Sequence, residues 1–267
     1  MTKPRKAYPT DLNDTEYALI APYLPKRKTR RGAPRTIPWR EILNGIFYVT
    51  RTGCSWGSLP HDLPKCKTIY HYHRQFRLLG LWETINQAIR EAVREQAGRE
   101  AQASAMILDS QSVKSAEGGE GRGFDGGKKV NGRKRNIIVD TQGLLVLAKV
   151  TPANVQDVHA GKQVLQALQE RPPLLTRLQT IFADGGYRGD LVEWVKDNLQ
   201  ADLTIVLRSD QKKGFQVLPK RWVVERSIAW IGRNRRLARD YERLAASSEA
   251  FIYIAMIRLG LRRLSLF

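Results

Sequence analysis

Residues 135–154, RNIIVDTQGLLVLAKVTPAN, contain the pattern that decides the fold of the second half of the chain. Two runs of aliphatic residues flank the short polar connection Thr141–Gly143. Aliphatic and β-branched residues favour strands, and a glycine in a short connection is typical of a hairpin turn. The stretch therefore predicts a β-hairpin.

The segments on either side of this hairpin extend the pattern. Before it, AMILDSQSVKSA at 105–116 predicts a short apolar strand that ends in polar residues. After it, helices are expected at 155–170 and 190–200, a strand running into a glycine turn at 178–189, a strand at 201–209, and a basic helix from about residue 221. An order of strand, hairpin, helix, strand, helix, strand and helix indicates a mixed α/β sheet with helices packed on it.

The first hundred residues have a different pattern, and the boundary falls at about residue 100. Residues 11–100 predict helices, including a second one at 39–53 and another at 66–79. The later helix is basic, which favours a helix-turn-helix that reads DNA. It carries Lys65, Lys67, His71, His73, Arg74 and Arg77. A plain helical bundle with a solvated basic face is the alternative.

The charge of the chain points to a polyanionic partner. Its 267 residues contain 45 Lys and Arg against 26 Asp and Glu, a formal net charge of +19. Nucleic acid is the first candidate and an anionic membrane the second. No apolar run is long enough to span a membrane, and the basic start is not a secretory signal. Two cysteines make no disulfide scaffold, so we expect a reducing, cytoplasmic setting.

Three carboxylates stand out. Asp109 follows AMIL and Asp184 follows TIFA, so each is expected at the end of an apolar strand, where open α/β sheets place their sites. A capping aspartate is the alternative for either one. Between residues 211 and 239, Glu225 is the only acidic residue among nine basic ones. It could pair with Arg221 or Arg226, or it could join the two aspartates in holding Mg²⁺.

Here the chain resembles the DDE transposases of bacterial insertion sequences, specifically the IS-five family. The resemblance rests on ILDSQSVKSA, GRKRNIIVDTQGLLVLAKVTPANVQD, FADGGYRG and RWVVERSIAWIGRNRRLARDYER, and on TGCSWGSLPHDLPKCKTIYHYHRQF near the start. It implies a helix-turn-helix-like DNA-binding domain at 1–100 and a ribonuclease-H-like catalytic domain at 101–267. It also implies catalytic, metal-binding roles for Asp109, Asp184 and Glu225, with Asp109 on the first strand of the sheet.

The resemblance further implies an activity and partners. The protein would hydrolyse DNA at the ends of the element and then transfer the freed 3′-OH into target DNA. It would use two Mg²⁺ ions, for which Mn²⁺ can substitute, bind terminal inverted repeats, and act as a homodimer on DNA in the bacterial nucleoid. A nuclease that cuts without joining, and a DNA-binding protein without catalysis, are the alternatives.

Contacts to DNA are expected from basic residues in both halves of the chain. In the family's motif around the glutamate, Arg221 stands at the arginine position, Leu218 replaces the tyrosine, and Gly232 replaces the lysine with Arg233 next to it. The predicted DNA contacts are Lys67, Arg74, Lys114, Arg188, Arg221, Arg226 and Arg233. Tyr187, beside Arg188, could contact DNA or lie in a solvated turn.

Two other patterns are weaker. Gly121, Gly123 and Gly126 match a dinucleotide-binding fingerprint by letter, but a strand and not a helix is expected after them, so residues 117–131 predict a mobile basic loop. Zinc is an alternative for the cluster of Cys54, His61, Cys66, His71 and His73, although the spacing fits no standard ligand pair.

Overall fold

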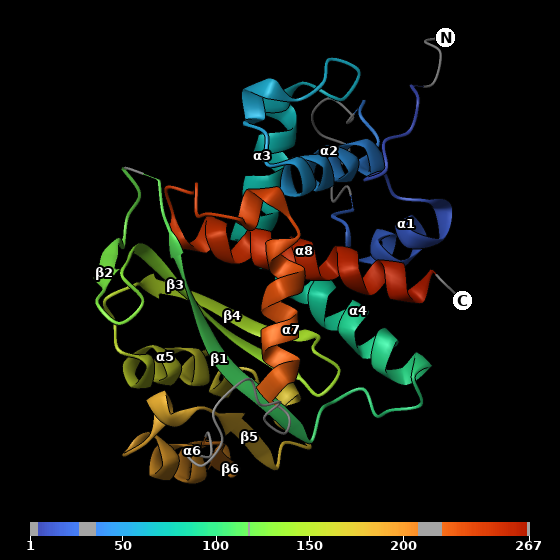
Figure 1. Ribbon diagram of the computed structural model, residues 1–267. Coiled ribbons are helices and arrows are strands. Elements are labelled where there is room, and N and C mark those ends of the chain that lie inside the picture. Colours follow the sequence, from blue (N-terminus) through green and yellow to red (C-terminus); the bar gives the residue numbers. More distant parts are fainter. Residues whose placement is uncertain (1–4, 27–35, 117, 208–220, 266–267) are drawn as a thin grey trace.

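The computed structural model describes residues 5–26, 36–116, 118–207 and 221–265 (Figure 1). Most of the basic segment at 26–38 lies outside these ranges. So do Lys212, Lys213, Leu218 and Lys220. None of the helices described is long and apolar enough to cross a membrane.

Helices fill the described part of the first hundred residues, as predicted. They are α1 (Asp14–Ile20), α2 (Trp39–Thr52), α3 (Cys66–Leu78) and α4 (Leu81–Gln96), with the 3₁₀ turns η1 (Ala21–Tyr23) and η2 (Trp56–Ser58). A capping box between Asn13 and Glu16 starts α1. Gly53, with φ of 74°, ends α2 in the left-handed conformation that glycine adopts most easily. Local sequence therefore sets the start of α1 and the end of α2.

The second half of the chain forms a mixed sheet with a central pair of long strands. Its strands are β1 (Ala105–Lys114), β2 (Gly123–Asp125), β3 (Val130–Asp140), β4 (Leu145–Pro152), β5 (Thr180–Ala183) and β6 (Asp202–Ile205). The order is β2-β3-β1-β5-β6, with β4 also paired to β3. β1, β5 and β6 are parallel, whereas β3 is antiparallel to β1, β2 and β4. The predicted hairpin is β3–β4.

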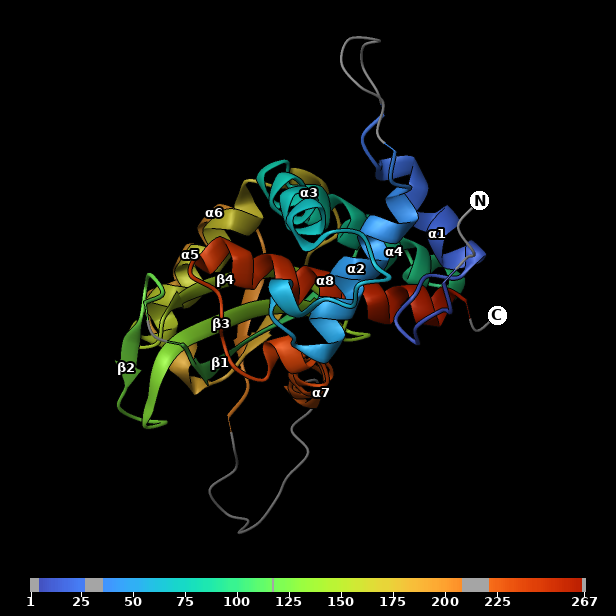
Figure 2. The ribbon, with the colours of Figure 1, turned by 90° about the horizontal axis from the view of Figure 1, so that it is seen from above.

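Helices cover both faces of this sheet (Figures 1 and 2). The helices α5 (Asp157–Gln169) and α6 (Leu191–Leu199) pack with one side of the sheet in one hydrophobic cluster. The other side packs against α4, α7 (Arg221–Gly232) and α8 (Ala245–Leu264). Side chains alternate between these faces along a strand. Ile107 therefore belongs to the cluster with α4, α7 and α8, and Leu108 to the cluster with α5 and α6. This is the layered α/β architecture expected of a ribonuclease-H-like domain.

Two predictions about elements were wrong. β1 does not end at Asp109 but continues five residues further to Lys114, because β3 pairs with it over its whole length from Met106 onward. The expected loop at 117–131 contains β2, whose residues Gly123–Asp125 pair with the start of β3. Residues 185–187 form the 3₁₀ turn η4 (Gly185–Tyr187), and the turns η3 (Pro172–Leu174) and η5 (Arg235–Leu237) were not predicted.

Buried arginines of β3 fasten the segment that follows α7. Arg133 is fully buried, and its Nη1 lies 3.1 Å from Asp240 Oδ2. Arg135, also buried, donates from Nη1 to the carbonyl of Leu237 at 2.8 Å. A charged group inside a protein needs such partners. The basic sequence GRKRN therefore fixes the path of the chain between α7 and α8, and part of its charge is structural.

Candidate active site

Asp109 lies in the middle of β1, on the face of the sheet that α7 covers. The alternation of side chains places it on the same side as Ile107. Its Oδ1 accepts a hydrogen bond from the backbone N–H of Ser110 at 2.7 Å. The carboxylate thus stands on a strand that pairs with β3 at this position and with β5 up to Ile107, which makes its backbone rigid.

Asp184 follows directly after β5, as predicted. It starts the turn η4, and its Oδ1 accepts a hydrogen bond from the Gly186 N–H at 2.8 Å. The capping role considered for this residue is therefore present, and it uses one carboxylate oxygen. The other oxygen, Oδ2, points to the arginine described below.

Glu225 lies on the second turn of α7, and the turn of the β3–β4 hairpin holds this helix in place. Ser227 Oγ donates to the carbonyl of Gly143 at 2.8 Å, and Arg226 Nη2 donates to the carbonyl of Gln142 at 3.0 Å. The guanidinium of Arg226 also lies over the rings of Trp222 and Trp230. These contacts set the position of the helix that carries Glu225.

The three carboxylates converge on one cation, the guanidinium of Arg221. Its Nη2 lies 3.9 Å from Asp109 Oδ2, 3.6 Å from Asp184 Oδ2 and 3.8 Å from Glu225 Oε1. The arginine side chain is only 14% exposed, so its charge is held within the cluster. The fold thus brings together Asp109, Asp184 and Glu225, which are 75 and 41 positions apart in the sequence. Three carboxylates against one guanidinium leave negative charge in excess.

Burial shifts the titration of Asp109. The pKa of its carboxyl is raised to about 6, first by desolvation and then by the nearby charge of Asp184. The Ser110 N–H and the charges of Arg221 and Lys128 oppose that rise. Burial thus makes the negative charge of this carboxylate less favourable than in water, and a nearby cation offsets that effect.

The donor set fits a divalent metal ion, although the side chains are not arranged as a ligand shell. Among the described residues, no group of three or more His, Cys, Asp or Glu side chains stands close enough to hold a metal as it is. The carboxylate oxygens instead surround Arg221 Nη2 at 3.6–3.9 Å. Mg²⁺ prefers carboxylate oxygens and keeps several waters, so three converging carboxylates match its chemistry. The same observation gives no support to zinc at Cys54, His61, Cys66, His71 and His73.

A fourth carboxylate, Asp157, adjoins the site and was missed from the sequence. It opens α5, accepts a hydrogen bond from Ser110 Oγ at 3.0 Å, and pairs with Lys134 Nζ at 2.7 Å. Lys134 is buried on β3, so the pair ties α5 to the two central strands. An aspartate in the first turn of a helix is usually explained by the helix dipole, which is why its position drew no attention. We regard it as a positioning residue.

The predicted DNA contacts occupy different surroundings. Lys67 and Arg74 are exposed on α3, opposite its buried residues Ile69, His73 and Phe76. Lys114, Arg188 and Arg233 are exposed as well, whereas Arg226 is bound to the hairpin turn. Arg221 lies among the carboxylates. The assignments as DNA contacts stay predictions.

Tyr187 is the residue of this group whose expected surroundings were wrong. It is 1% exposed and packs in the cluster beneath α5 and α6, so it lies neither in a solvated turn nor on a DNA-facing surface. Burial raises the pKa of its hydroxyl above the ordinary value. Tyr187 can be buried because Gly161 of α5 has no side chain. A Cβ at this position would collide with the Tyr187 ring.

Comparison with known families shows to which protein family the chain belongs. The family model described as "Transposase DDE domain" matches residues 100–259, which is more than half of the chain and contains Asp109, Asp184 and Glu225. The chain belongs to this family of DDE transposases. A second model, "Putative transposase of IS4/5 family", matches residues 12–86, the helical region of the same DDE transposase.

Two relatives of this DDE transposase come from Burkholderia cepacia. One, "Putative transposase for insertion sequence element IS402", is 32% identical over 128 residues, which cover 45% of this chain and 59% of the relative. The other, "Insertion element IS402 uncharacterized 16.2 kDa protein", is 28% identical over 114 residues, or 41% of this chain and 76% of the relative. The chain thus spans less than two thirds of the first relative's length.

Proposed function

We propose that this chain is the transposase of an insertion sequence. It hydrolyses a DNA strand at each end of the element and then joins the freed 3′-OH to target DNA. The observation that supports this most directly is the convergence of Asp109, Asp184 and Glu225 on one cation, within the region that matches the DDE family. Family membership and a net charge of +19 agree with a DNA substrate.

The chemistry is two displacements at phosphorus. In the first, water attacks the phosphodiester at the element end and the bond from phosphorus to the 3′ oxygen breaks. This leaves a 5′-phosphate that carries the water oxygen; a proton of the water passes to solvent, and the 3′ oxygen takes up a proton to become the 3′-OH. In the second, the 3′-OH attacks a target phosphodiester and a target 3′ oxygen leaves. One phosphodiester bond replaces another in this second step, so neither ATP nor a covalent protein–DNA intermediate is needed.

The protein's contribution to both steps is placement. Asp109 on β1 and Asp184 after β5 stand on paired strands, and Glu225 closes the site from α7. Arg221, in contact distance of all three, can turn its guanidinium to a phosphate oxygen, which arginine binds well. We assign the metal ligands as Asp109, Asp184 and Glu225. Two bound Mg²⁺ ions, with Mn²⁺ as a substitute, would supply the charge that stabilises the attacking and leaving oxygens.

DNA recognition is proposed for the first hundred residues. The exposed face of α3 carries Lys67, His71 and Arg74, and its buried residues pack into the helical bundle. The recognition helix of a helix-turn-helix needs such an exposed face on a fixed support. We assign the terminal inverted repeats to this region and the remaining contacts to Lys114, Arg188, Arg221, Arg226 and Arg233. A homodimer follows from the need to hold two element ends, and a place on the bacterial nucleoid follows from the substrate.

A strand-joining assay tests the proposal. The substrate is a duplex oligonucleotide that carries an element end with a free 3′-OH, mixed with target plasmid and Mg²⁺. Joined product supports the transposase, cut but unjoined DNA supports the nuclease, and binding without either supports the catalytically silent DNA-binding protein. Glu225→Gln should abolish joining while duplex binding persists; joining by this variant would show that the site is assigned wrongly. Glu193→Gln, an exposed glutamate on α6, is the matched control.

A further inference from the structure

A second concave site lies where α2, α7 and α8 meet, apart from the three carboxylates. It is a cavity of about 90 Å³ lined by four arginines together with Thr10 and Trp230. The arginines, here called the arginine pocket, are Arg51, Arg233, Arg258 and Arg262. They come from the last turn of α2, the residue after α7, and two successive turns of α8. Of these residues the proposed function uses only Arg233, as a DNA contact, and it assigns no role to the cavity itself.

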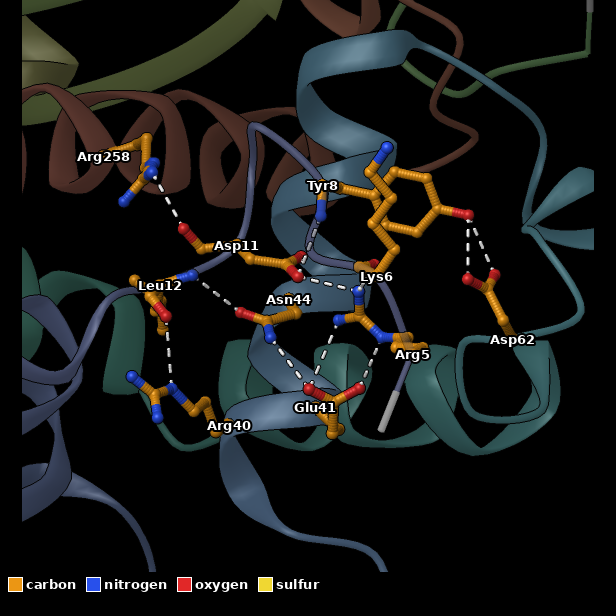
Figure 3. A network of polar contacts seen from close by, with 10 residues as sticks. All are labelled: Arg5, Lys6, Tyr8, Asp11, Leu12, Arg40, Glu41, Asn44, Asp62 and Arg258. Carbon is orange, nitrogen blue, oxygen red and sulfur yellow. Dashed lines mark hydrogen bonds and ion pairs between the residues drawn. The ribbon is translucent and has the colours of Figure 1, made fainter. Parts of the chain in front are cut away.

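Positive charge in the arginine pocket is only partly balanced. Arg258 Nη1 lies 2.6 Å from Glu16 Oε2. Figure 3 shows its second contact, in which Nη2 donates to the carbonyl of Asp11. Within the described ranges, Arg51, Arg233 and Arg262 form no ion pair with a carboxylate. Burial, followed by the charges of Arg258 and Arg51, lowers the pKa of the Arg262 guanidinium. Like charges that crowd together at a cavity favour an anion inside it.

Two hydrogen-bond groups of the cavity lack partners of their own. Thr10 is 7% exposed, and its hydroxyl has no hydrogen-bond partner among the described residues. The Nε of Arg258 is also shielded and unpaired in that part of the chain. Buried polar groups are almost always satisfied, and a small turn of either side chain toward the cavity that its residue lines would give these two groups an acceptor there. A phosphate group carries acceptor oxygens and the negative charge that the arginines lack.

The size of the cavity restricts the ligand. A single water needs on the order of 10–15 Å³ of cavity, so about 90 Å³ admits a small oxyanion with one or two waters and excludes a whole nucleotide. Arginine is the residue best suited to phosphate, because its planar fork of N–H groups matches the oxygens. We propose that the arginine pocket is a phosphate-binding site, and that its phosphate belongs to the backbone of bound DNA.

The choice of DNA as the source rests on the proposed function and on the course of α7. Glu225 lies on this helix, and Trp230 and Arg233 at its far end line the cavity. Eight residues of helix span about 12 Å, so a DNA strand that reaches the carboxylates can also reach the pocket. A backbone phosphate bound there would fix the end of α7 and thereby the position of Glu225. Free inorganic phosphate is the other source of the same group.

Thermal unfolding of the full chain tests the pocket without any cutting or joining. We compare sodium phosphate with sodium chloride at equal ionic strength for wild type, Arg262→Gln, Arg51→Gln, Thr10→Val and the control Arg177→Gln, which removes an exposed arginine elsewhere. Phosphate stabilises many proteins non-specifically, so only differences between variants count. Wild type and Arg177→Gln should gain more from phosphate than the pocket variants, and Thr10→Val should bind it about tenfold more weakly.

Salt dependence of duplex binding identifies the source of the phosphate. Loss of one phosphate contact should lower the slope of log K against log salt by about 1, in Arg262→Gln and Arg51→Gln but not in Arg177→Gln. A changed slope supports the DNA backbone; an unchanged slope with a lost phosphate effect supports free phosphate at the same pocket. If neither the slope nor the phosphate effect differs from the control, the pocket is not a phosphate site. That result would leave the joining activity of the wild type untouched.

Discussion

A single arginine holds together the negative charges of the candidate site. Arg221 Nη2 lies within 3.9 Å of all three carboxylates, at distances too long for strong hydrogen bonds. Its positive charge lowers the pKa of Asp109 against the larger effect of burial, which raises that pKa to about 6. The guanidinium is therefore a counter-ion that can be exchanged for another cation.

Removing this charge should be visible in the titration of Asp109. In Arg221→Gln, without metal, we expect the pKa of Asp109 to rise further above about 6, whereas Arg221→Lys should keep it near the wild-type value. Carbon-13 NMR of the Asp109 carboxyl against pH measures the shift. An unchanged or lower pKa in Arg221→Gln would mean that the arginine does not neutralise this carboxylate.

His73 predicts how stability depends on pH. Burial among aromatic rings lowers its pKa from 6.5 to about 3, so the folded protein keeps the ring neutral while the unfolded chain protonates it. The unfolded state then binds more protons between pH 6.5 and 3, and stability must fall as the pH falls through this window. Between pH 6.5 and 4 we expect a loss of about 3 kcal/mol from this residue.

The measurement is urea unfolding at several pH values for wild type and His73→Phe. The variant should show a smaller decrease of unfolding free energy between pH 6.5 and 4, whatever its stability at pH 7. An equal decrease in both proteins would assign the acid sensitivity to other groups. Absolute stability is not the readout, because the larger ring also alters packing.

At the scale of elements, the turn between β3 and β4 positions α7. Gly143 in this turn has φ of 79°, and a Cβ there would come within 2.7 Å of Ser227 Oγ and 3.0 Å of the Trp230 ring. Gly143→Ala combines backbone strain with a collision, so it should destabilise the fold by about 1–3 kcal/mol. It should also lower joining activity by displacing Glu225.

Activity of this variant is compared with that of Gly189→Ala, which also has a positive φ but has no atom near the added Cβ. Both variants carry backbone strain, and only Gly143→Ala pushes on α7. Equal joining rates for the two, measured below their unfolding temperatures, would contradict a role for the hairpin turn in placing Glu225.

The type of most predicted elements followed from local pattern, with β2 as the exception, whereas their limits depended on distant partners. Asp184 stands directly after β5 as expected, because TIFA is short and a glycine turn ends it. Asp109 does not end its strand, since β3 supplies hydrogen bonds to the polar residues up to Lys114. These polar residues show no regular alternation with apolar ones, so the sequence cannot distinguish a strand from a loop at this place. Sequence could bring out the carboxylates, but not their distances or Asp157, which depends on α5 folding back onto β1.

At the scale of the whole molecule, one hydrophobic core joins the first helices to the last. Buried residues of α2, α3 and α4 belong to the same cluster as those of α8 and one face of the sheet. Gly260 of α8 lets Ile89 of α4 approach so closely that a Cβ would lie 2.4 Å from it. The sequence did not draw attention to α8, although it is the 20-residue helix that connects the two regions.

This shared core predicts that the two regions do not fold independently. A fragment of residues 101–267 would expose the face of α8 that packs on α4, so it should lack a cooperative unfolding transition and near-ultraviolet circular dichroism. Addition of the 1–100 fragment should restore both. A cooperative transition of the isolated 101–267 fragment near that of the full chain would instead support two autonomous domains with a boundary at about residue 100.

The central claim is that Asp109, Asp184 and Glu225 act as one catalytic unit. Residues that act as a unit show losses that do not add, because removal of any one already disables the site. The most direct test measures strand-joining rates with Mg²⁺ for Asp109→Asn, Asp184→Asn, Glu225→Gln and the triple variant, at equal DNA occupancy. We predict that each single variant loses nearly as much activity as the triple, by at least about a thousandfold. Losses that multiply from single to triple variant, or joining that survives in any single variant, would contradict the claim.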